Sequence, residues 1–330
     1  MKFAIITEGG LEMGMGHIYR CLNLAEALPT KQDIHFITKS GNTVCAKIKN
    51  SGFNLTRFES DVEIPDFLES IKANIIIVDR LEIDENFVKK IKEKTKSKIK
   101  IVIFGNQSSA NRYADIVINS VVGSNFKNRK FLDKSTNTLY LYGPKYLVLR
   151  KEFYEINKIK KRSDNKKIKK ILLIFGGSDP SNLTSRVLDR LLSYNENWNI
   201  DVLLGAAFEH FNELNQVMAR YPEKKENVFI YKDVREVAKF MFSSDLIITS
   251  PGLSMFEAFF ARVKTILICQ NSFQKIEFSG YINVYDPSVI ENLREIISDR
   301  VKLKKNISIG NRLKPGQGKQ EIIDLILEER

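Results

Sequence analysis

The first 28 residues predict a β-strand, a glycine-rich loop and an α-helix in immediate succession. Lys2–Thr7 (KFAIIT) is an apolar run of strand length, and the loop that begins at Glu8 contains Gly14 and Gly16, which tolerate backbone angles that other residues resist. His17 falls in the first turn of the helix, where free amides and the positive end of the helix dipole favour anions. Such a unit is typical of a parallel α/β sheet, whose ligands bind at the carboxyl ends of the strands. Apolar side chains recur at helical spacing after the loop at Leu22, Leu24, Ala25 and Leu28.

Two interpretations of this loop stay open. A tight turn in which His17 bonds a backbone carbonyl would explain the glycines. A ligand site would also explain the histidine, which tends to stay neutral at a helix start and can accept a proton. We favour the ligand site because the loop follows the first strand. The dinucleotide fingerprint G-x-G-x-x-G is absent, since Tyr19 stands where its third glycine belongs, and this disfavours an NAD enzyme.

The composition is that of a globular protein with a basic surface. The chain has 330 residues, enough for two domains with a core each, and is 43% hydrophobic and 28% charged. Its net charge of +12 suits anionic ligands such as nucleotides, nucleic acid or acidic lipid headgroups, without choosing among them. No recognisable nucleic-acid reader motif occurs, so we expect no nucleic-acid partner.

Cysteine usage and hydrophobicity predict a cytoplasmic location. Cys21, Cys45 and Cys269 show no C-x-x-C spacing and leave an odd one over, which indicates reduced thiols. The first apolar run ends at Thr7 without the pattern of a secretory signal, and no apolar stretch approaches the roughly 18 residues of a membrane span. We therefore expect no integral membrane segment, while peripheral contact with a membrane stays open.

Short apolar runs alternate with helical segments along the chain, which predicts α/β domains with parallel sheets. The run Asn74–Val78 ends in Asp79, as expected for a strand that is buried on both faces and delivers a polar side chain at its carboxyl end. The run Ile99–Phe104 ends at Gly105-Asn106. The other strands expected in the first half are Asp33–Thr38, Phe53–Phe58, Ile116–Ile118 and Leu139–Tyr142.

A change of composition near residue 150 predicts two domains. We assign 1–150 to an N-terminal Rossmann-like domain, 151–169 to a basic linker and 170–330 to a C-terminal Rossmann-like domain. Lysine and arginine dominate Lys158–Lys170, which we interpret as a solvated segment rather than a nucleic-acid arm, because no aromatic residue interleaves the charges. The last helix, Gln320–Glu329, is expected to pack back across the domain junction.

The second half restarts with the same order of strand, glycine-rich turn and helix. Lys170–Phe175 is followed by Gly176 and Gly177, whose bare amides before a helix would cradle a diphosphate, although a structural turn explains them nearly as well. Asp179 is a natural N-cap and Pro180 a natural first residue for the helix that follows. The further strands expected here are Ile200–Leu204, Val228–Ile230, Leu246–Thr249 and Thr265–Ile268.

A third candidate loop, Ser250–Glu257 (SPGLSMFE), follows an apolar strand and restarts a helix. Pro251 would stand in the first turn, and i,i+3 spacing puts Ser254 and Glu257 on one face. A carboxylate at this place can accept hydrogen bonds from both hydroxyls of a ribose, while the serines and the amides around Gly252 hold phosphate. The alternative is an exposed glutamate on an ordinary helix.

Four separated motifs occur in an order that is typical of one protein family. They are Gly14-Met15-Gly16-His17 with Arg20, Gly143-Pro144-Lys145-Tyr146 leading to Leu149-Arg150-Lys151-Glu152-Phe153, Gly176-Gly177-Ser178-Asp179-Pro180 with Asn182-Leu183, and Ser250–Glu257. Over about Lys2–Asn271 the chain resembles the PseG/SpsG-like sugar-nucleotide proteins. The resemblance implies the GT-B architecture, with two Rossmann-like domains facing across a cleft, and kinship with MurG-type glycosyltransferases. The best-known members hydrolyse UDP-diacetamido-trideoxy-altropyranose on the route to pseudaminic acid.

Carried over by position, the resemblance implies a catalytic role for His17, oriented by Asp79 at the end of the fourth strand. It also implies that the second domain binds UDP and the first contacts the sugar. The positions expected to bind substrate are Gly14, Gly16, Arg20, Asn106, Gly176, Gly177, Ser250, Gly252, Ser254, Glu257 and Asn271. We expect no metal and no cofactor, because the visible residues require neither.

Two positions depart from the family. Arg80-Leu81 follows Asp79 where the family commonly has His-Tyr or Ser-Tyr, and Gly105-Asn106-Gln107 stands where it often has paired aspartates. The loss of a carboxylate pair is compatible with a different substrate, a slower reaction, or a protein that binds without turnover.

The resemblance thus implies a hydrolase that releases UDP from a UDP-activated diacetamido-trideoxy sugar, in nonulosonic (pseudaminic) acid or surface-polysaccharide biosynthesis. The departing diphosphate would be stabilised by the amides of Gly176 and Gly177 and by the helix start after Pro251. Two rivals stay open: a GT-B glycosyltransferase that moves the sugar to an acceptor, and a catalytically weak sugar-nucleotide-binding protein.

Overall fold

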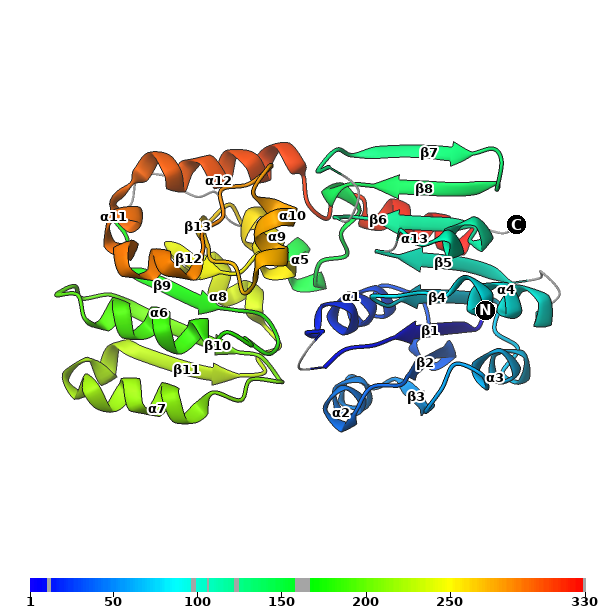
Figure 1. Cartoon of the computed structure of the whole chain (residues 1–330), viewed down its shortest axis with the longest axis horizontal. Helices are drawn as coiled ribbons and strands as arrows, with labels where there is room; N and C mark the ends of the chain where they lie inside the picture. The colour runs from blue at the N-terminus through cyan, green and yellow to red at the C-terminus, as the bar shows by residue number, and fades with distance from the viewer. Residues whose placement is uncertain (11–12, 96–98, 106, 122–124, 158–166, 329–330) are drawn as a thin grey trace. The chain divides into compact units, whose positions relative to one another are not determined.

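The computed structural model describes residues 1–10, 13–95, 99–105, 107–121, 125–157 and 167–328 (Figure 1). The chain divides into two compact units. Unit 1 comprises Met1–Leu149 and Leu313–Arg330, and unit 2 comprises Arg150–Arg312. Each unit contains a single, largely parallel sheet with helices, which confirms the predicted α/β class with two Rossmann-like domains.

The sheet of unit 1 has the strand order β3-β2-β1-β4-β5-β6-β8-β7. Every neighbouring pair is parallel except β7 with β8, which form an antiparallel hairpin at one edge. β7 carries mainly exposed, charged residues and so had no apolar signal in the sequence. The strands are β1 (Phe3–Thr7), β2 (Ile34–Thr38), β3 (Asn54–Arg57), β4 (Ile75–Asp79), β5 (Lys100–Phe104), β6 (Ile116–Asn119), β7 (Arg129–Asp133) and β8 (Thr138–Tyr142).

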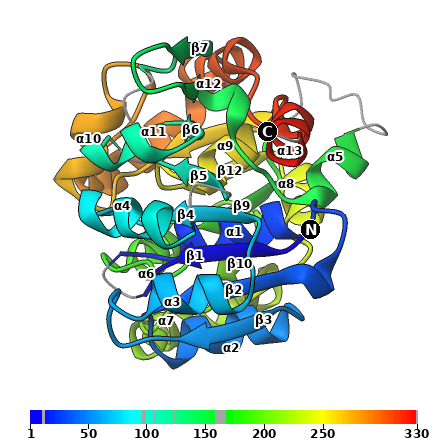
Figure 2. The same cartoon turned by 90° about the vertical axis from the view of Figure 1, so that its right-hand side faces the viewer.

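Helices cover the central strands of unit 1, so that β1 and β4 are buried along their whole length. On one face, Ile6 and Val78 pack in a core with α3 and α4, which lie side by side (Figure 2). This double burial explains why both strands read as continuous apolar runs. The helices of unit 1 are α1 (Gly16–Ala25), α2 (Asn42–Asn50), α3 (Ile64–Ser70), α4 (Glu85–Lys94) and α13 (Lys319–Leu327), with 3-10 turns η1 (Lys31–Asp33), η2 (Ser109–Tyr113) and η3 (Pro144–Tyr146).

The sheet of unit 2 has the order β11-β10-β9-β12-β13, with all neighbouring pairs parallel. Along β9, Ile171 and Leu173 join a core with α6 and α7, while Leu172 and Ile174 face a second core with α8. The strands are β9 (Lys170–Ile174), β10 (Asn199–Leu204), β11 (Val228–Lys232), β12 (Leu246–Thr249) and β13 (Lys264–Leu267). The helices are α5 (Lys151–Asn157), α6 (Leu183–Leu192), α7 (Phe211–Arg220), α8 (Val237–Ser243), α9 (Leu253–Phe260), α10 (Ser272–Phe278), α11 (Leu293–Ser298) and α12 (Arg300–Leu313), with 3-10 turns η4 (Pro222–Asn227) and η5 (Pro287–Asn292).

The units differ from the expected domain boundaries at two places. Residues 313–330 were assigned to the second domain, but they belong to unit 1, where the carbonyl of Lys145 accepts the amide of Gly318 at 2.7 Å and Lys145 pairs with Glu321 at 2.9 Å. The expected linker 151–169 begins as helix α5, because Phe153 is fully buried in the core of unit 2. Its residues 158–166 lie outside the described residues.

Both sheets reverse their strand order at one point. In unit 1, β2 and β3 lie on one side of β1, and β4 and the strands after it lie on the other side. In unit 2, β10 and β11 lie on one side of β9, and β12 and β13 lie on the other side. The loops after β1 and β4 therefore flank the reversal in unit 1, and those after β9 and β12 flank it in unit 2. Open α/β sheets bind ligands in the crevice at such a point.

Candidate functional site

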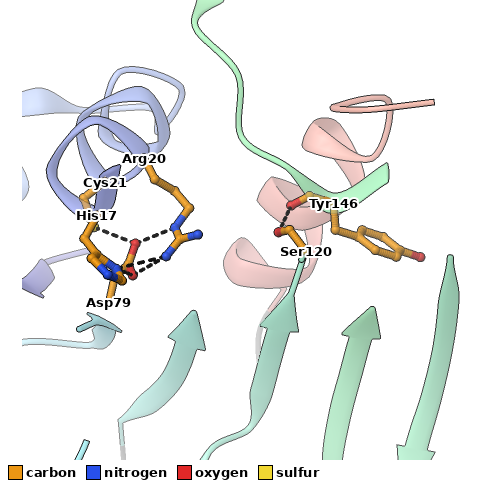
Figure 3. A network of polar contacts seen from close by, with 6 residues as sticks. All are labelled: His17, Arg20, Cys21, Asp79, Ser120 and Tyr146. Carbon is orange, nitrogen blue, oxygen red and sulfur yellow. Dashed lines mark hydrogen bonds and ion pairs between the residues drawn. The ribbon is translucent and has the colours of Figure 1, made fainter. Parts of the chain in front are cut away.

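His17 and Asp79 meet at the carboxyl edge of the sheet of unit 1. His17 lies in the first turn of α1, and Asp79 is the last residue of β4. Nδ1 of His17 lies 2.6 Å from Oδ1 of Asp79, and Figure 3 shows the two side chains directed toward each other. The carboxylate is fully buried, whereas the His17 side chain is 17% exposed. The pair expected from the sequence is therefore in contact, with one inaccessible member and one that solvent reaches.

The backbone around β1 brings these two side chains together. Thr7, the last residue of β1, is the register partner of Asp79 in the parallel pairing of β1 with β4. The loop then turns sharply: Gly14 has φ +74°, and a Cβ at Gly9 would lie 2.7 Å from a side-chain carbon of α1. These glycines let α1 begin close above the end of β4, and His17 reaches the carboxylate as a result.

Arg20 holds the same carboxylate from the next turn of α1. Its Nε donates to Oδ2 of Asp79 at 2.6 Å and its Nη2 to Oδ1 at 2.5 Å, and its guanidinium lies over the ring of Phe104. Gly105 has φ +63°, and a Cβ there would lie 3.0 Å from Nη2 of Arg20. Arg20 was expected to bind substrate, but its observed partner is Asp79. The guanidinium of Arg20 therefore occupies the space into which a side chain at residue 105 would project.

The electrostatics of this cluster favour an ionised Asp79. Burial by itself would raise the pKa of Asp79, but the charge of Arg20 and the hydrogen bonds from Arg20 and His17 outweigh it and hold the pKa well below its usual range. Nη2 of Arg20 also lies 3.1 Å from Nδ1 of His17. Because the contact with Asp79 is the shorter of the two and an ionised carboxylate only accepts, we assign the proton of neutral His17 to Nδ1. The Nε2 atom is then left as an acceptor, which is the arrangement of a histidine base oriented by a carboxylate.

Two further contacts near this site are structural. Sγ of Cys21 lies 3.5 Å from Oδ2 of Asp79, and burial together with the Asp79 charge raises the pKa of the Cys21 thiol well above its usual value. Cys21 therefore stays protonated and is not a nucleophile. Elsewhere in the same view, Oγ of Ser120 donates to the carbonyl of Tyr146 at 2.9 Å, which ties the end of β6 to η3 (Figure 3).

Arg80, one of the departures from the family, anchors the start of the His17 loop. Its side chain is only 3% exposed, with Nε 3.1 Å from Oε1 of Glu8 and Nη1 2.9 Å from Oδ1 of Asp61. Lys39 lies within 3.5 Å of the same two carboxylates. The cluster joins loops that follow four different strands. The sequence held no signal for it, because its partners are far apart along the chain.

In unit 2, the two predicted nucleotide loops lie on neighbouring strands. The loop at Gly176 follows β9 and the loop at Ser250 follows β12, which pairs with β9. Gly176 has φ +85° and Gly252 φ +153°, and a Cβ at either would meet no atom within 4 Å. The carbonyl of Gly177 packs instead against Gly205, where a Cβ would lie 2.3 Å away. Gly176 and Gly252 thus border open space, and their positive φ angles favour glycine at both positions.

The helix after Gly176 starts later than predicted. α6 begins at Leu183 rather than at Pro180, and Asp179 is not the N-cap residue. The Asp179 carboxylate still satisfies the first amides of the helix, accepting from Leu183 at 2.9 Å and from Thr184 at 2.8 Å. Nε2 of Gln270 also donates to Asp179 at 2.8 Å. The capping chemistry was correctly predicted, but an extra turn separates the cap from the helix.

Gln270 and Gln274 were missed by the sequence analysis. The backbone carbonyl of Gln270 accepts from Oγ of Ser181 at 2.6 Å, and Nε2 of Gln274 donates to the carbonyl of Pro251 at 2.8 Å. The two glutamines therefore connect the loops that follow β9, β12 and β13. A polar residue directly after the apolar run of β13 was the available signal.

Glu257 is buried on α9. This helix begins at Leu253, so Pro251 precedes it instead of standing in its first turn. Glu257 is 0% exposed, which rules out the alternative of an exposed glutamate, while Ser254 is half-buried. Three buried oxygen atoms here have no hydrogen-bond partner among the described residues: the two carboxylate oxygens of Glu257 and Oγ of Ser250. Burial raises the pKa of Glu257 to about 7, although Arg150 acts against the rise.

The remaining predicted positions that the structure describes have no contact that points to a ligand. Asn271 is exposed and caps α10, accepting the amide of Gln274 at 3.0 Å, a structural role that accounts for its side chain. Gly16 opens α1 and has no close neighbour at its Cβ position. Asn106 lies outside the described residues. Within the described ranges, no group of three or more His, Cys, Asp or Glu residues is arranged to hold a metal ion, and no helix is long and apolar enough to cross a bilayer.

Comparison with known sequences finds two relatives, and no model of a known protein family matches the chain. The chain is 43% identical to the uncharacterized protein MJ1062 of Methanocaldococcus jannaschii over 99% of its own length, and it spans 66% of the length of that relative. It is 28% identical to the spore coat polysaccharide biosynthesis protein SpsG of Bacillus subtilis, over 82% of this chain and 78% of SpsG. The chain is therefore similar in sequence to SpsG.

Comparison with solved structures identifies the fold. MurG of Acinetobacter baumannii matches with a TM-score of 0.62 at 14% identity, covering 99% of both chains. HepE of Anabaena, solved in complex with UDP, matches with a TM-score of 0.53 at 11% identity, covering 99% of this chain and 96% of HepE. Together with the two Rossmann-like units, these matches show the GT-B fold.

Proposed function

We propose that this protein is a hydrolase that releases UDP from a UDP-activated diacetamido-trideoxy sugar, in nonulosonic acid or surface-polysaccharide biosynthesis. The kinship with SpsG and the fold shared with UDP-bound HepE support a sugar nucleotide as the ligand. The observation that carries the proposal is the His17–Asp79 contact of 2.6 Å, which leaves Nε2 of His17 as a base at the point where a ligand is expected.

Unit 2 would bind the nucleotide. The diphosphate would lie at the Gly176 and Gly252 loops, where a Cβ would meet no atom within 4 Å and the backbone can approach an anion closely. The ribose would bind near Glu257, whose two oxygens accept no hydrogen bond within the described part of the chain, although Nε of Arg150 lies 3.2 Å from Oε1. A ribose diol supplies two hydroxyl donors, which matches this unsatisfied carboxylate.

Unit 1 would supply the base. Nε2 of His17 removes a proton from water while the water oxygen forms a bond to the anomeric carbon of the sugar. The bond from that carbon to the diphosphate oxygen breaks, and UDP leaves with the electron pair. Asp79 keeps His17 in the required tautomer and stabilises the imidazolium that forms, and Arg20 keeps Asp79 ionised.

Transfer to an acceptor is the second candidate. The same Nε2 atom would deprotonate a sugar or lipid hydroxyl as readily as water, and the relationship to a polysaccharide-biosynthesis protein favours such an acceptor. The two reactions differ in whether UDP appears when no acceptor is present. Binding without turnover is the third outcome, motivated by Gly105-Asn106 in place of paired aspartates.

The test measures UDP release from UDP-diacetamido-trideoxy-hexoses by the purified protein, with no acceptor added. We expect release by the wild type and a loss of at least about a hundredfold in His17→Ala, as for removal of a general base. His35→Ala is the matched control, because His35 lies on β2 bonded to Thr56 and should leave turnover intact. UDP binding without release, or a His17→Ala variant with full activity, would refute the hydrolase.

A further inference from the structure

A buried ion pair stands at the start of unit 2. Nε of Arg150, the first residue of this unit, lies 3.2 Å from Oε1 of Glu257 on α9. Glu257 is fully buried and the Arg150 side chain is 17% exposed. Sequence analysis had placed Arg150 in a family motif without giving it a role, and the UDP site proposed above does not use it.

The residues that follow Arg150 pack into unit 2. Oε1 of Glu152 accepts the amide of Ala238 at 2.9 Å, which ties α5 to the start of α8. Phe153 is fully buried and packs against Phe242 and Phe260. The segment that follows Arg150 is thus attached to unit 2 by a hydrogen bond and by buried aromatic contacts.

A buried carboxylate without hydrogen bonds is costly, and it tends to take up a proton. Two charged groups face Glu257 from α5 and the residue before it: Arg150, which favours the ionised form, and Glu152, which opposes it. Without Arg150, Glu257 would retain only burial and a like charge, both of which favour the protonated acid. A protonated acid cannot accept hydrogen bonds from two hydroxyls with both of its oxygens as a carboxylate does.

We propose that Arg150 is a positioning residue that keeps Glu257 ionised and oriented, so that the carboxylate recognises the 2′- and 3′-hydroxyls of the nucleotide's ribose. The proposal rests on the function proposed above and adds a determinant of selectivity for ribonucleotides over 2′-deoxyribonucleotides. Arg150 acts through Glu257 and does not itself touch the ribose. Its effect should therefore depend on whether the nucleotide carries the 2′-hydroxyl.

The test compares the affinities of UDP and 2′-deoxyuridine 5′-diphosphate by isothermal titration calorimetry. We expect wild type to prefer UDP by about tenfold, as for one hydrogen bond to a charged group. In Arg150→Gln the affinity for UDP should fall by about tenfold, while that for the deoxynucleotide changes little, so that the preference disappears. Lys151→Gln is the matched control, since it removes one positive charge from the adjacent, 72% exposed position and should keep the preference.

Each other outcome overturns the proposal. If Arg150→Gln weakens both nucleotides equally, Arg150 acts on the diphosphate or on the fold. If the variant binds UDP more tightly, Arg150 competes with the ribose. Should Arg150→Gln not fold, Arg150→Lys serves, because a lysine is a point charge without the guanidinium plane, and its preference should fall below that of wild type. An unchanged preference in Arg150→Lys then refutes the idea. If the wild-type protein binds no UDP, the proposed function fails together with this inference. If wild type binds UDP and only the Arg150 variants behave otherwise than expected, this inference alone fails.

Discussion

Replacing Asp79 with asparagine tests the cluster around His17 most directly. The change removes the negative charge but keeps the size of a side chain that is fully buried and contacts both Arg20 and His17. Breaking a buried ion pair by neutralising one partner costs about 3–5 kcal/mol, because it leaves the other charge unpaired. For a domain of this size, that corresponds to a fall in melting temperature of roughly 10 °C.

The same substitution should change how stability depends on pH. The pKa of Asp79 is lowered in the folded protein, so its carboxylate contributes stability that is fully present above the unfolded pKa of about 4 and is lost as the pH falls through the folded pKa. The difference in melting temperature between wild type and Asp79→Asn should accordingly be constant above about pH 5 and shrink in strong acid.

Thermal unfolding followed by circular dichroism measures both effects. The pH should be varied from about 3 to about 8, because this range extends on both sides of the pKa of a free aspartate, which is about 4. The matched control is Asp66→Asn, which breaks a pair of 2.6 Å with Lys94 at a position 66% exposed. A surface pair contributes about 0–1 kcal/mol, so this variant should melt within about 3 °C of wild type. Equal melting of Asp79→Asn and wild type would show that the Arg20–Asp79–His17 cluster does not hold the site together.

Three further outcomes are expected. Because the pKa of Glu257 is raised to about 7 and the ionised form is proposed to hold the ribose, UDP affinity in titration calorimetry should decline as the pH falls below 7, and Glu257→Gln should abolish this dependence; a flat wild-type profile would count against the ribose role. Gly105→Ala should lower the free energy of unfolding in urea by about 1–2 kcal/mol, and by more than Gly52→Ala, because both have positive φ but only Gly105 lies against Arg20. Phe153→Ala should cost about 3–5 kcal/mol in the same assay, and a smaller loss would mean that α5 is not part of the core of unit 2.

Much of the fold was predictable because the central strands are buried on both faces. β1, β4 and β9 appear in the sequence as continuous apolar runs, and each was predicted close to its observed bounds. β7 was missed because exposed residues make up most of it, which leaves no alternating apolar signal. α12 was also missed, although Leu303, Ile309 and Leu313 are buried at helical spacing. Local chemistry was also predictable: Asp179 does satisfy the first amides of α6.

The positions of helix starts and the assignment of the last residues were not predictable. α6 and α9 begin after the proline that was expected to start them, because Gln270 and Gln274 hold the preceding turns from a different strand connection. Residues 313–330 join unit 1 through hydrogen bonds to the Gly143–Tyr146 segment, with partners more than a hundred positions away. Contacts over such distances leave no mark on local periodicity.

The glycine-rich loop and His17 were determined by the sequence itself, since glycine spacing, a strand before the loop and a helix after it are local properties. Only the tertiary structure decided what His17 contacts. Asp79 lies 62 residues further along the chain and reaches His17 because β1 and β4 pair in parallel at the reversal of strand order. The same holds for Arg150 and Glu257, because burial and the absence of hydrogen bonds at a carboxylate arise only when distant segments pack together.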